Sequence, residues 1–218
     1  MRLFAIGDIH GCRQALQRLD QEIQFCATDT VVTLGDYVDR GPDSRGVIEH
    51  LFGLRKRCRL IALKGNHEVM MLRARADCPV VADWLSFGGD AALDSYPAKT
   101  LDDIPDAHWR FLESTVDYHE TSREFFVHAN ANPDVPLQDQ PDYMLQWEFL
   151  GHPAPHQSGK RMICGHTSQH TGRPLNLGHA VCIDTNCCNG GCLTCLDVRT
   201  NAYWLDSEAG DVRQGVLG

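Results

Sequence analysis

Three short apolar segments in the first half of the chain end in the same way, with a glycine followed by an aspartate or an asparagine. The junctions are Gly7-Asp8 after LFAI (3–6), Gly35-Asp36 after TVVTL (30–34), and Gly65-Asn66 after LIAL and one lysine (60–64). Asp36 lies 28 residues after Asp8, and Asn66 lies 30 residues after Asp36. This interval is the size of one βαβ unit, so the sequence predicts consecutive units of that kind.

The segments between these strands carry apolar residues at helical spacing. Helices are predicted over residues 12–25, 44–57 and 67–76. The resulting β-α-β-α-β-α order indicates a parallel sheet. The second half contains mainly short strands, predicted at 123–129, 160–166, 179–185, 192–198 and 202–206. Turn residues separate the last three strands, which favours an antiparallel meander. A mixed α/β layer fold follows.

The chain is expected to form one domain, residues 1–218. Of its 218 residues, 43% are hydrophobic, which is enough for one sizeable core. It has no linker rich in Pro, Gly or Ser and no repeat of solenoid period. The middle, roughly 77–120, is less regular, with a Gly-Gly turn in WLSFGGD and one predicted helix in DAHWRFLEST (106–115).

Polar residues of metal-ligand type follow five of the predicted strands. The carboxyl ends of parallel strands line the binding crevice of an open α/β sheet, so we expect these ends to converge. The two carboxylates, one amide and three imidazoles are Asp8, His10, Asp36, Asn66, His128 and His166. Mixed oxygen and nitrogen ligands without thiolate suit Mn, Fe or Zn better than Ca or Mg. Six ligands exceed the need of one tetrahedral zinc, so the sequence predicts two ions and a bridging carboxylate.

Each of these residues, taken alone, has an ordinary structural explanation. An aspartate or asparagine after a strand commonly caps the next helix, and a single histidine is usually a surface or core residue. The repetition at βαβ spacing favours the functional interpretation. The remaining histidines do not end predicted strands and are expected to be structural: His50, His108, His119, His152, His156, His170 and His179.

The ten cysteines are expected to be reduced thiols, because the chain is long and begins without a signal peptide. A cluster near the C-terminus, Cys187, Cys188, Cys192 and Cys195, resembles a zinc site. However, Cys192 and Cys195 are three apart in a predicted strand, and alternating side chains would place them on opposite faces. Buried thiols are therefore the favoured interpretation over a structural zinc.

Net charge and hydropathy argue against two classes of partner. The net charge is −9, and no cluster of lysine or arginine stands out, so phosphate-mediated binding to nucleic acid and docking on an anionic membrane are not expected. No apolar run approaches the ~20 residues of a membrane span. A cytoplasmic location is expected.

The strand-end motifs resemble those of the phosphoprotein phosphatase (serine/threonine-specific) family of calcineurin-like metallophosphoesterases, in its compact bacterial and phage type. The matching motifs are GDIHG (7–11), GDYVDRG (35–41), GNHE (65–68), VHA (127–129) and GH (165–166). They span about 160 residues in the family's order. The resemblance implies a two-sheet mixed β-sandwich flanked by helices, with a dinuclear metal site at the strand ends.

The resemblance also implies a role for each motif residue. Asp8 and His10 would bind the first metal, Asp36 would bridge, and Asn66, His128 and His166 would complete the second. Arg40 would bind the phosphoryl group, and His67, held by Asp39, would protonate the leaving group. The metals, most simply Mn²⁺ with Fe or Zn as alternatives, would supply a hydroxide for direct in-line attack. These roles are chemically coherent, because an alkoxide is a poor leaving group and needs a proton.

One part of the family's pattern is missing. The family usually carries a second phosphate-binding arginine shortly after a tryptophan, but here Glu148 and Phe149 follow Trp147. Arg123, Lys160 and Arg161 are candidates for replacing it. The expected activity is hydrolysis of phosphomonoesters, chiefly phosphoserine and phosphothreonine in proteins or peptides, with phosphotyrosine as a further substrate. The alternative is a symmetrical dinucleoside polyphosphate (diadenosine tetraphosphate) hydrolase. A binding module that has lost catalysis is disfavoured, because every catalytic residue type is retained.

Overall fold

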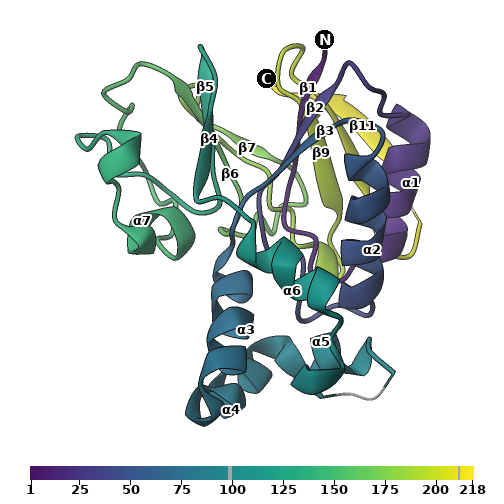
Figure 1. The fold of residues 1–218 in the computed structure, drawn as a ribbon. Helices are drawn as coiled ribbons and strands as arrows, with labels where there is room; N and C mark the ends of the chain where they lie inside the picture. Colours follow the sequence, from purple (N-terminus) through teal and green to yellow (C-terminus); the bar gives the residue numbers. More distant parts are fainter. Residues whose placement is uncertain (98–99, 211) are drawn as a thin grey trace.

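A computed structural model of the chain describes residues 1–97, 100–210 and 212–218. Two mixed β-sheets pack face to face (Figure 1). The larger sheet has the strand order β11-β10-β9-β1-β2-β3, and the smaller has the order β4-β5-β6-β8-β7. Side chains from both sheets share one buried cluster, which includes Ala5 and Val32 of the larger sheet and Phe126, Ile163 and Val181 of the smaller. The predicted two-sheet sandwich is confirmed.

The first half folds as the strand-helix alternation predicts. The elements are β1 (Leu3–Ile6), α1 (Arg13–Ile23), β2 (Thr30–Thr33), α2 (Ser44–Arg55), β3 (Arg59–Ala62) and α3 (Asn66–Ala76). The three strands pair in parallel. Phe4, Ile6 and Val31 face the helices, whereas Ala5 and Val32 face the second sheet. The strands read as continuous apolar runs because both of their faces are buried.

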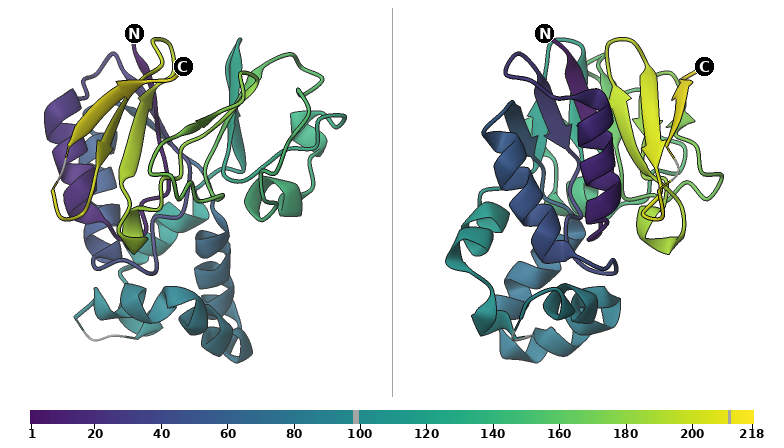
Figure 2. Two further views of the ribbon diagram at one scale, coloured as in Figure 1. Left: turned by 180° about the vertical axis from the view of Figure 1, so that it is seen from behind. Right: turned by 90° about the vertical axis from the view of Figure 1, so that its right-hand side faces the viewer.

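Helices cover the outer faces of the sandwich and one of its ends. The views in Figure 2 show α1 and α2 along the outer face of the larger sheet. Beyond α3, a helical segment lies at the end where β1, β2 and β3 terminate. It contains Cys78–Val80, α4 (Val81–Trp84), a π-helical turn (Leu85–Gly89), α5 (Asp90–Asp94), Leu101–Asp103 and α6 (Asp106–Glu113). Only α6 is predicted from the sequence, because the turns before it are too short to show periodicity.

The second half differs from its predicted connectivity. Its elements are β4 (Tyr118–Glu120), β5 (Glu124–Val127), Leu137–Asp139, α7 (Asp142–Gln146), β6 (Arg161–Cys164), β7 (Leu175–Asn176), β8 (Ala180–Cys182), Cys187–Asn189, β9 (Leu193–Asp197), β10 (Ala202–Asp206) and β11 (Arg213–Val216). The expected meander of 179–185 with the next two strands is wrong. β8 pairs in parallel with β6 in the smaller sheet, and β9 crosses to pair with β1. The meander is instead formed by β9, β10 and β11.

The cysteine cluster behaves as buried thiols. Cys187, Cys192 and Cys195 are buried and Cys188 is half-buried. Among the described residues, no group of three close metal-ligating side chains includes a cysteine. Burial raises the pKa of Cys188 to about 12, which leaves its thiol protonated at neutral pH. The preference for buried thiols over a zinc site is consistent with this arrangement.

Candidate dinuclear metal centre

The predicted ligand residues converge at the carboxyl ends of β1, β2, β3, β5 and β6. Asp36 lies at the centre, with one carboxylate oxygen 3.2 Å from His10 Nε2 and the other 3.5 Å from His128 Nε2. Asn66 Oδ1 lies 3.0 Å from His128 Nε2 and 3.2 Å from His166 Nδ1. The sixth residue, Asp8, joins the group because its carboxylate accepts the backbone N–H of His166 at 2.9 Å. All six residues therefore meet in one site.

The three histidines are oriented by backbone carbonyls. His10 Nδ1 lies 2.9 Å from the Val38 carbonyl, and His128 Nδ1 lies 2.8 Å from the Leu34 carbonyl. His166 uses its other nitrogen, Nε2, which lies 3.0 Å from the Trp147 carbonyl. Each ring donates one N–H to a carbonyl, so the second nitrogen of a neutral imidazole presents its lone pair to the site.

These lone pairs face acceptors. They point at the carboxylate of Asp36 and the amide oxygen of Asn66, at the distances given above. A nitrogen lone pair that faces an oxygen lone pair is unfavourable unless a cation lies between the two atoms. Two groups of close ligand atoms share Asp36, namely His10-Asp36-His67 and Asp36-His128-His166. The donor set is oxygen and nitrogen without sulfur, so the residues suit two divalent metal ions of borderline type.

The electrostatics of the carboxylates point the same way. Burial and the nearby carboxylates of Asp184 and Asp36 raise the pKa of Asp8 well above its ordinary value. Burial acts in the same direction on Asp36, but His128, His67 and His10 outweigh it and lower its pKa. Two carboxyl groups packed this closely are compatible with full ionisation only beside positive charge.

The backbone of the site is held in unusual conformations. Positive φ angles occur at His10 (42°), Asp36 (50°), Asp39 (70°), Arg40 (67°) and His166 (57°). Non-glycine residues rarely adopt this region, and clusters of them mark functional sites. Close approach also explains one glycine: a Cβ on Gly65 would overlap the Oδ1 atom of Asp36. The turn after β3 therefore needs glycine for the ligands to meet.

His67 and Asp39 form a buried pair beside the ligands. His67 Nδ1–H donates to Asp39 Oδ2 at 2.7 Å, and both side chains are fully buried. Trp84 Nε1–H donates to the same carboxylate at 3.0 Å. His67 Nε2 is buried with no hydrogen-bond partner among the described residues, and it belongs to a group of potential metal-ligating atoms with His10 and Asp36. Burial raises the pKa of Asp39 to about 8 and lowers that of His67 to about 3.

Glu68 supports the turns that carry the ligands. Its fully buried carboxylate accepts backbone N–H groups from Asp36 at 2.7 Å, Tyr37 at 2.8 Å and Gly65 at 2.9 Å. It thereby ties the turn after β2 to the turn after β3. Burial and the Asp36 carboxylate raise the pKa of Glu68 to about 8. The sequence offers one signal for this role, the third position of a helix that starts at a glycine, which is typical of a capping box.

The helical segment after α3 positions Arg40. The backbone N–H of Arg40 donates to the Gly88 carbonyl at 2.9 Å, and its Nη1 lies 3.3 Å from His10 Nε2. Gly88 has a φ of 102°, and a Cβ there would lie 2.7 Å from Arg40 Cγ. Because Trp84 of the same segment donates to the Asp39 carboxylate, the segment holds both Asp39 and Arg40 in place. The pattern WLSFGGD thus has a positioning role that sequence reasoning missed.

A cavity of about 410 Å³ opens over the ligands. Arg40 is its only arginine or lysine among the described residues. Its outer wall contains Phe149, His170, Asn186 and Asn189. His170 was expected to be structural, so its place here is a correction. It belongs to a loop after β6 rather than to a strand end, and the strand-end rule could not select it.

Phe149 occupies the wall at the sequence position where an arginine is expected. Its side chain is 69% exposed, and its ring stacks on His166 with centroids 5.3 Å apart. The three candidate replacements lie elsewhere. Arg123, Lys160 and Arg161 stand at the amino ends of β5 and β6, whereas His128 and His166 follow the carboxyl ends. Four residues of strand separate the two ends by about 13 Å. None of the three therefore replaces the arginine.

Comparison with known proteins connects this site to a family. The model of the calcineurin-like phosphoesterase family matches residues 1–192. Serine/threonine-protein phosphatase 1 of Salmonella typhimurium is 40% identical over 89 residues, which are 40% of this chain and 39% of that protein. A symmetrical bis(5'-nucleosyl)-tetraphosphatase of Ectopseudomonas mendocina is 30% identical over 139 residues, 63% of this chain and 47% of that protein.

The chain thus spans less than half the length of these curated relatives. A crystal structure of a candidate diadenosine tetraphosphatase superposes with a TM-score of 0.70 over 99% of this chain and 93% of that one, at 20% identity. At that identity the superposition establishes the fold. The family match over most of the chain, together with the converged ligand set, leads to one conclusion: the chain belongs to the calcineurin-like phosphoesterases.

Proposed function

We propose that the chain is a metal-dependent phosphomonoesterase that acts on phosphoserine and phosphothreonine in polypeptides, with phosphotyrosine as a further substrate. The observation that carries this proposal is the His67–Asp39 pair. His67 Nε2 lies beside the proposed ligands with no hydrogen-bond partner among the described residues, while Nδ1 is held by the buried carboxylate of Asp39. A serine or threonine alkoxide is a poor leaving group, and an oriented imidazole is the group that can give it a proton.

Six residues would hold two divalent metal ions, for which we propose Mn²⁺, with Fe or Zn as alternatives. They are Asp8, His10, Asp36, Asn66, His128 and His166. When bound, such ions neutralise phosphoryl oxygens and activate water for in-line attack. The fit rests on the lone pairs of His128 and His166, which face the amide oxygen of Asn66. His10 Nε2 lies between the Asp36 carboxylate at 3.2 Å and Arg40 Nη1 at 3.3 Å.

The other residues of the site bind and orient the substrate. Arg40 presents a guanidinium beside His10 and offers a forked contact to the phosphoryl oxygens. Asp39 fixes the ring of His67 with Nε2 directed into the site, and the proton that this buried pair holds would pass from Nε2 to the leaving oxygen. Burial around the pair keeps bulk water away from this proton.

A second candidate is the symmetrical hydrolysis of dinucleoside tetraphosphates. It is supported by the bis(5'-nucleosyl)-tetraphosphatases among the relatives, and by the exposed Phe149 ring, on which a nucleobase could stack. The single Arg40 in the cavity and the net charge of −9 favour one phosphoryl group over a chain of four. The phosphomonoesterase therefore remains the leading proposal.

The two candidates separate in one assay. The Mn²⁺-loaded protein is given phosphoseryl, phosphothreonyl and phosphotyrosyl peptides and diadenosine tetraphosphate, and kcat/KM is measured for each. The proposal expects the phosphopeptides to be preferred. A higher kcat/KM for diadenosine tetraphosphate than for every peptide would replace it with the second candidate. Chelated protein serves as the control and should be inactive on all four.

Partners and location are further expectations of this proposal. The substrates are phosphorylated polypeptides, with no role for nucleic acid or a membrane, and the enzyme acts in the cytoplasm. The proposed location agrees with the thiol form of the nine cysteines that the structure describes. No helix in the described part of the chain is long and apolar enough to cross a membrane.

A further inference from the structure

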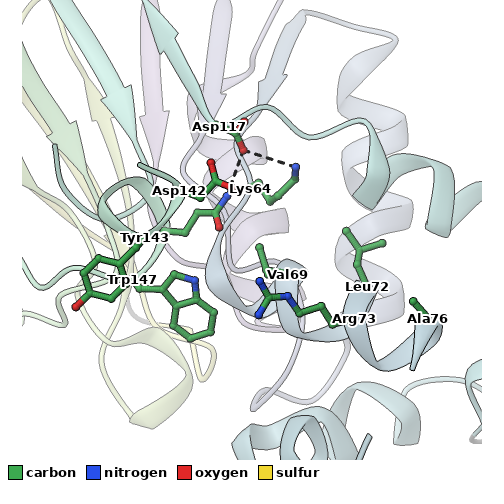
Figure 3. Close-up of a pocket in the computed structure, with 10 residues that line it drawn as sticks. Lys64, Val69, Leu72, Arg73, Ala76, Asp117, Asp142, Tyr143 and Trp147 are labelled. Carbon is green, nitrogen blue, oxygen red and sulfur yellow. Dashed lines mark hydrogen bonds and ion pairs between the residues drawn. The ribbon is translucent and has the colours of Figure 1, made fainter. Parts of the chain in front are cut away.

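A second cavity, of about 720 Å³, lies next to the metal centre between α3 and α7 (Figure 3). One wall is the exposed face of α3, with Val69, Leu72 and Arg73. The opposite wall is formed by Tyr143 and Trp147, from α7 and the residue that follows it. None of these residues lines the cavity over the ligands. The proposed reaction therefore leaves this second cavity without a role.

One wall belongs to the helix that carries a proposed metal ligand, and the other wall contacts a second ligand. Helix α3 begins with Asn66 and His67, so Val69 lies within its first turn and Arg73 about two turns along. The carbonyl of Trp147 accepts the ring Nε2–H of His166 at 3.0 Å. A chain bound at the metals can therefore continue into this cavity without crossing a separate structural element.

The charges in the cavity are distributed unevenly. Lys64 Nζ lies 3.6 Å from Asp117, which also accepts Gln146 Nε2–H at 3.2 Å, so these groups satisfy one another. The exposed guanidinium of Arg73 has no ion pair or hydrogen bond with any residue the structure describes. In Figure 3 it points toward the Trp147 side of the cavity, away from Asp117 and Asp142. The available cation thus stands beside the apolar and aromatic part of the lining.

We infer that this cavity is a subsite for the polypeptide that flanks the phosphorylated residue. Arg73 would receive an acidic side chain, and Val69, Leu72 and Trp147 would receive the apolar part of the segment. Arg73 lies six residues beyond His67, a rise of about 9 Å along the helix. An extended peptide covers that distance in about three residues. The inference rests on the proposed function and adds a sequence preference to it.

The test uses phosphoseryl peptides with glutamate or lysine three residues from the phosphoserine, placed on either side. The quantity measured is the kcat/KM of each peptide relative to that of 4-nitrophenyl phosphate, which is too small to reach the cavity. In the Mn²⁺-loaded wild type, one of the two placements should favour glutamate over lysine by about threefold to tenfold, as expected for a partly exposed ion pair. Arg73→Glu should reverse this preference.

Arg75→Glu is the matched control. Arg75 lies on the same helix as Arg73, and its replacement by glutamate changes the net charge equally. However, Arg75 pairs with Glu113 at 2.9 Å and stacks on Trp109, outside the cavity. It should keep the wild-type preference. The subsite would be overturned if Arg73→Glu kept the wild-type preference for glutamate over lysine. It would also be overturned if only Arg75→Glu lost that preference. Neither result would affect the proposal of phosphopeptide hydrolysis. Failure to hydrolyse any phosphoseryl peptide would overturn the proposed function, and this inference with it.

Discussion

Glu68→Gln tests whether the two ligand-bearing turns are held together by one buried carboxylate. Glu68 Oε2 accepts the N–H groups of Asp36 and Gly65, and Oε1 accepts that of Tyr37. Glutamine has one oxygen, so its best rotamer keeps the first two bonds and turns an NH₂ group against the Tyr37 N–H. The variant loses the bond to Tyr37 and leaves that buried N–H without an acceptor, which costs about 1–3 kcal/mol. The connection that Glu68 makes between the two turns is then weaker, so the affinity for metal should fall.

The assay is urea denaturation at a fixed Mn²⁺ concentration, so that metal linkage is comparable between variants. Glu49→Gln is the control, because Glu49 is 45% exposed and pairs with Arg45 on the surface of α2. It should change the free energy of unfolding by about 0.5 kcal/mol or less. If Glu68→Gln unfolds within that same margin of the wild type, the carboxylate does not brace the turns and the reasoning fails.

Three further predictions concern single positions. Gly88→Ala would place a Cβ 2.7 Å from Arg40 Cγ, so KM for 4-nitrophenyl phosphate should rise severalfold with little loss of metal; an unchanged KM would show that this contact does not position Arg40. His67→Asn should lower kcat by about 10²–10⁴ with both metals retained, whereas loss of metal on elemental analysis would make His67 a ligand. The bond from Arg2 lowers the pKa of Asp29 to about 2 from 3.8. Because this folded-state pKa is depressed, the stabilisation is present above about pH 4 and is lost as the pH falls toward 2. Asp29→Asn should therefore lower the free energy of unfolding by about 1–2 kcal/mol at pH 7, after allowance for the exposed Arg2, and by about 0.4 kcal/mol or less near pH 2; an undiminished difference at pH 2 would contradict the assignment.

The sequence was sufficient where structure depends on local pattern. The apolar runs that end in Gly7-Asp8, Gly35-Asp36 and Gly65-Asn66 predicted three parallel strands and the end at which their polar residues meet. The histidines of VHA and GH could be added because they too follow strands. All six proposed ligands accordingly lie in one site.

Non-local pairing was beyond the same reasoning. The composition of segment 179–185 suits a strand of either sheet. The pattern of its side chains therefore could not show that β8 pairs with β6, or that β9 crosses to β1. His170, Trp84 and Gly88 were missed for a related reason. They reach the site from loops and short turns, where no periodicity links the residue to the place it occupies.

Glu68 shows an intermediate case. Its side chain lies in the first turn of α3, where the helix dipole favours an acidic residue, and this local position can be read from the sequence. Its bonds to Asp36 and Tyr37, however, reach a turn about 30 residues earlier in the chain, and only the packed structure brings these groups together.

The central claim is that Asp36 is shared by two metal ions. The most direct measurement is the metal content per chain, by elemental analysis after Mn²⁺ loading and desalting. Two ions are expected in the wild type, and both should be lost in Asp36→Asn. Asp29→Asn makes the same chemical change far from the ligands and should keep both ions. Two retained ions in Asp36→Asn, or a single ion in the wild type, would contradict it.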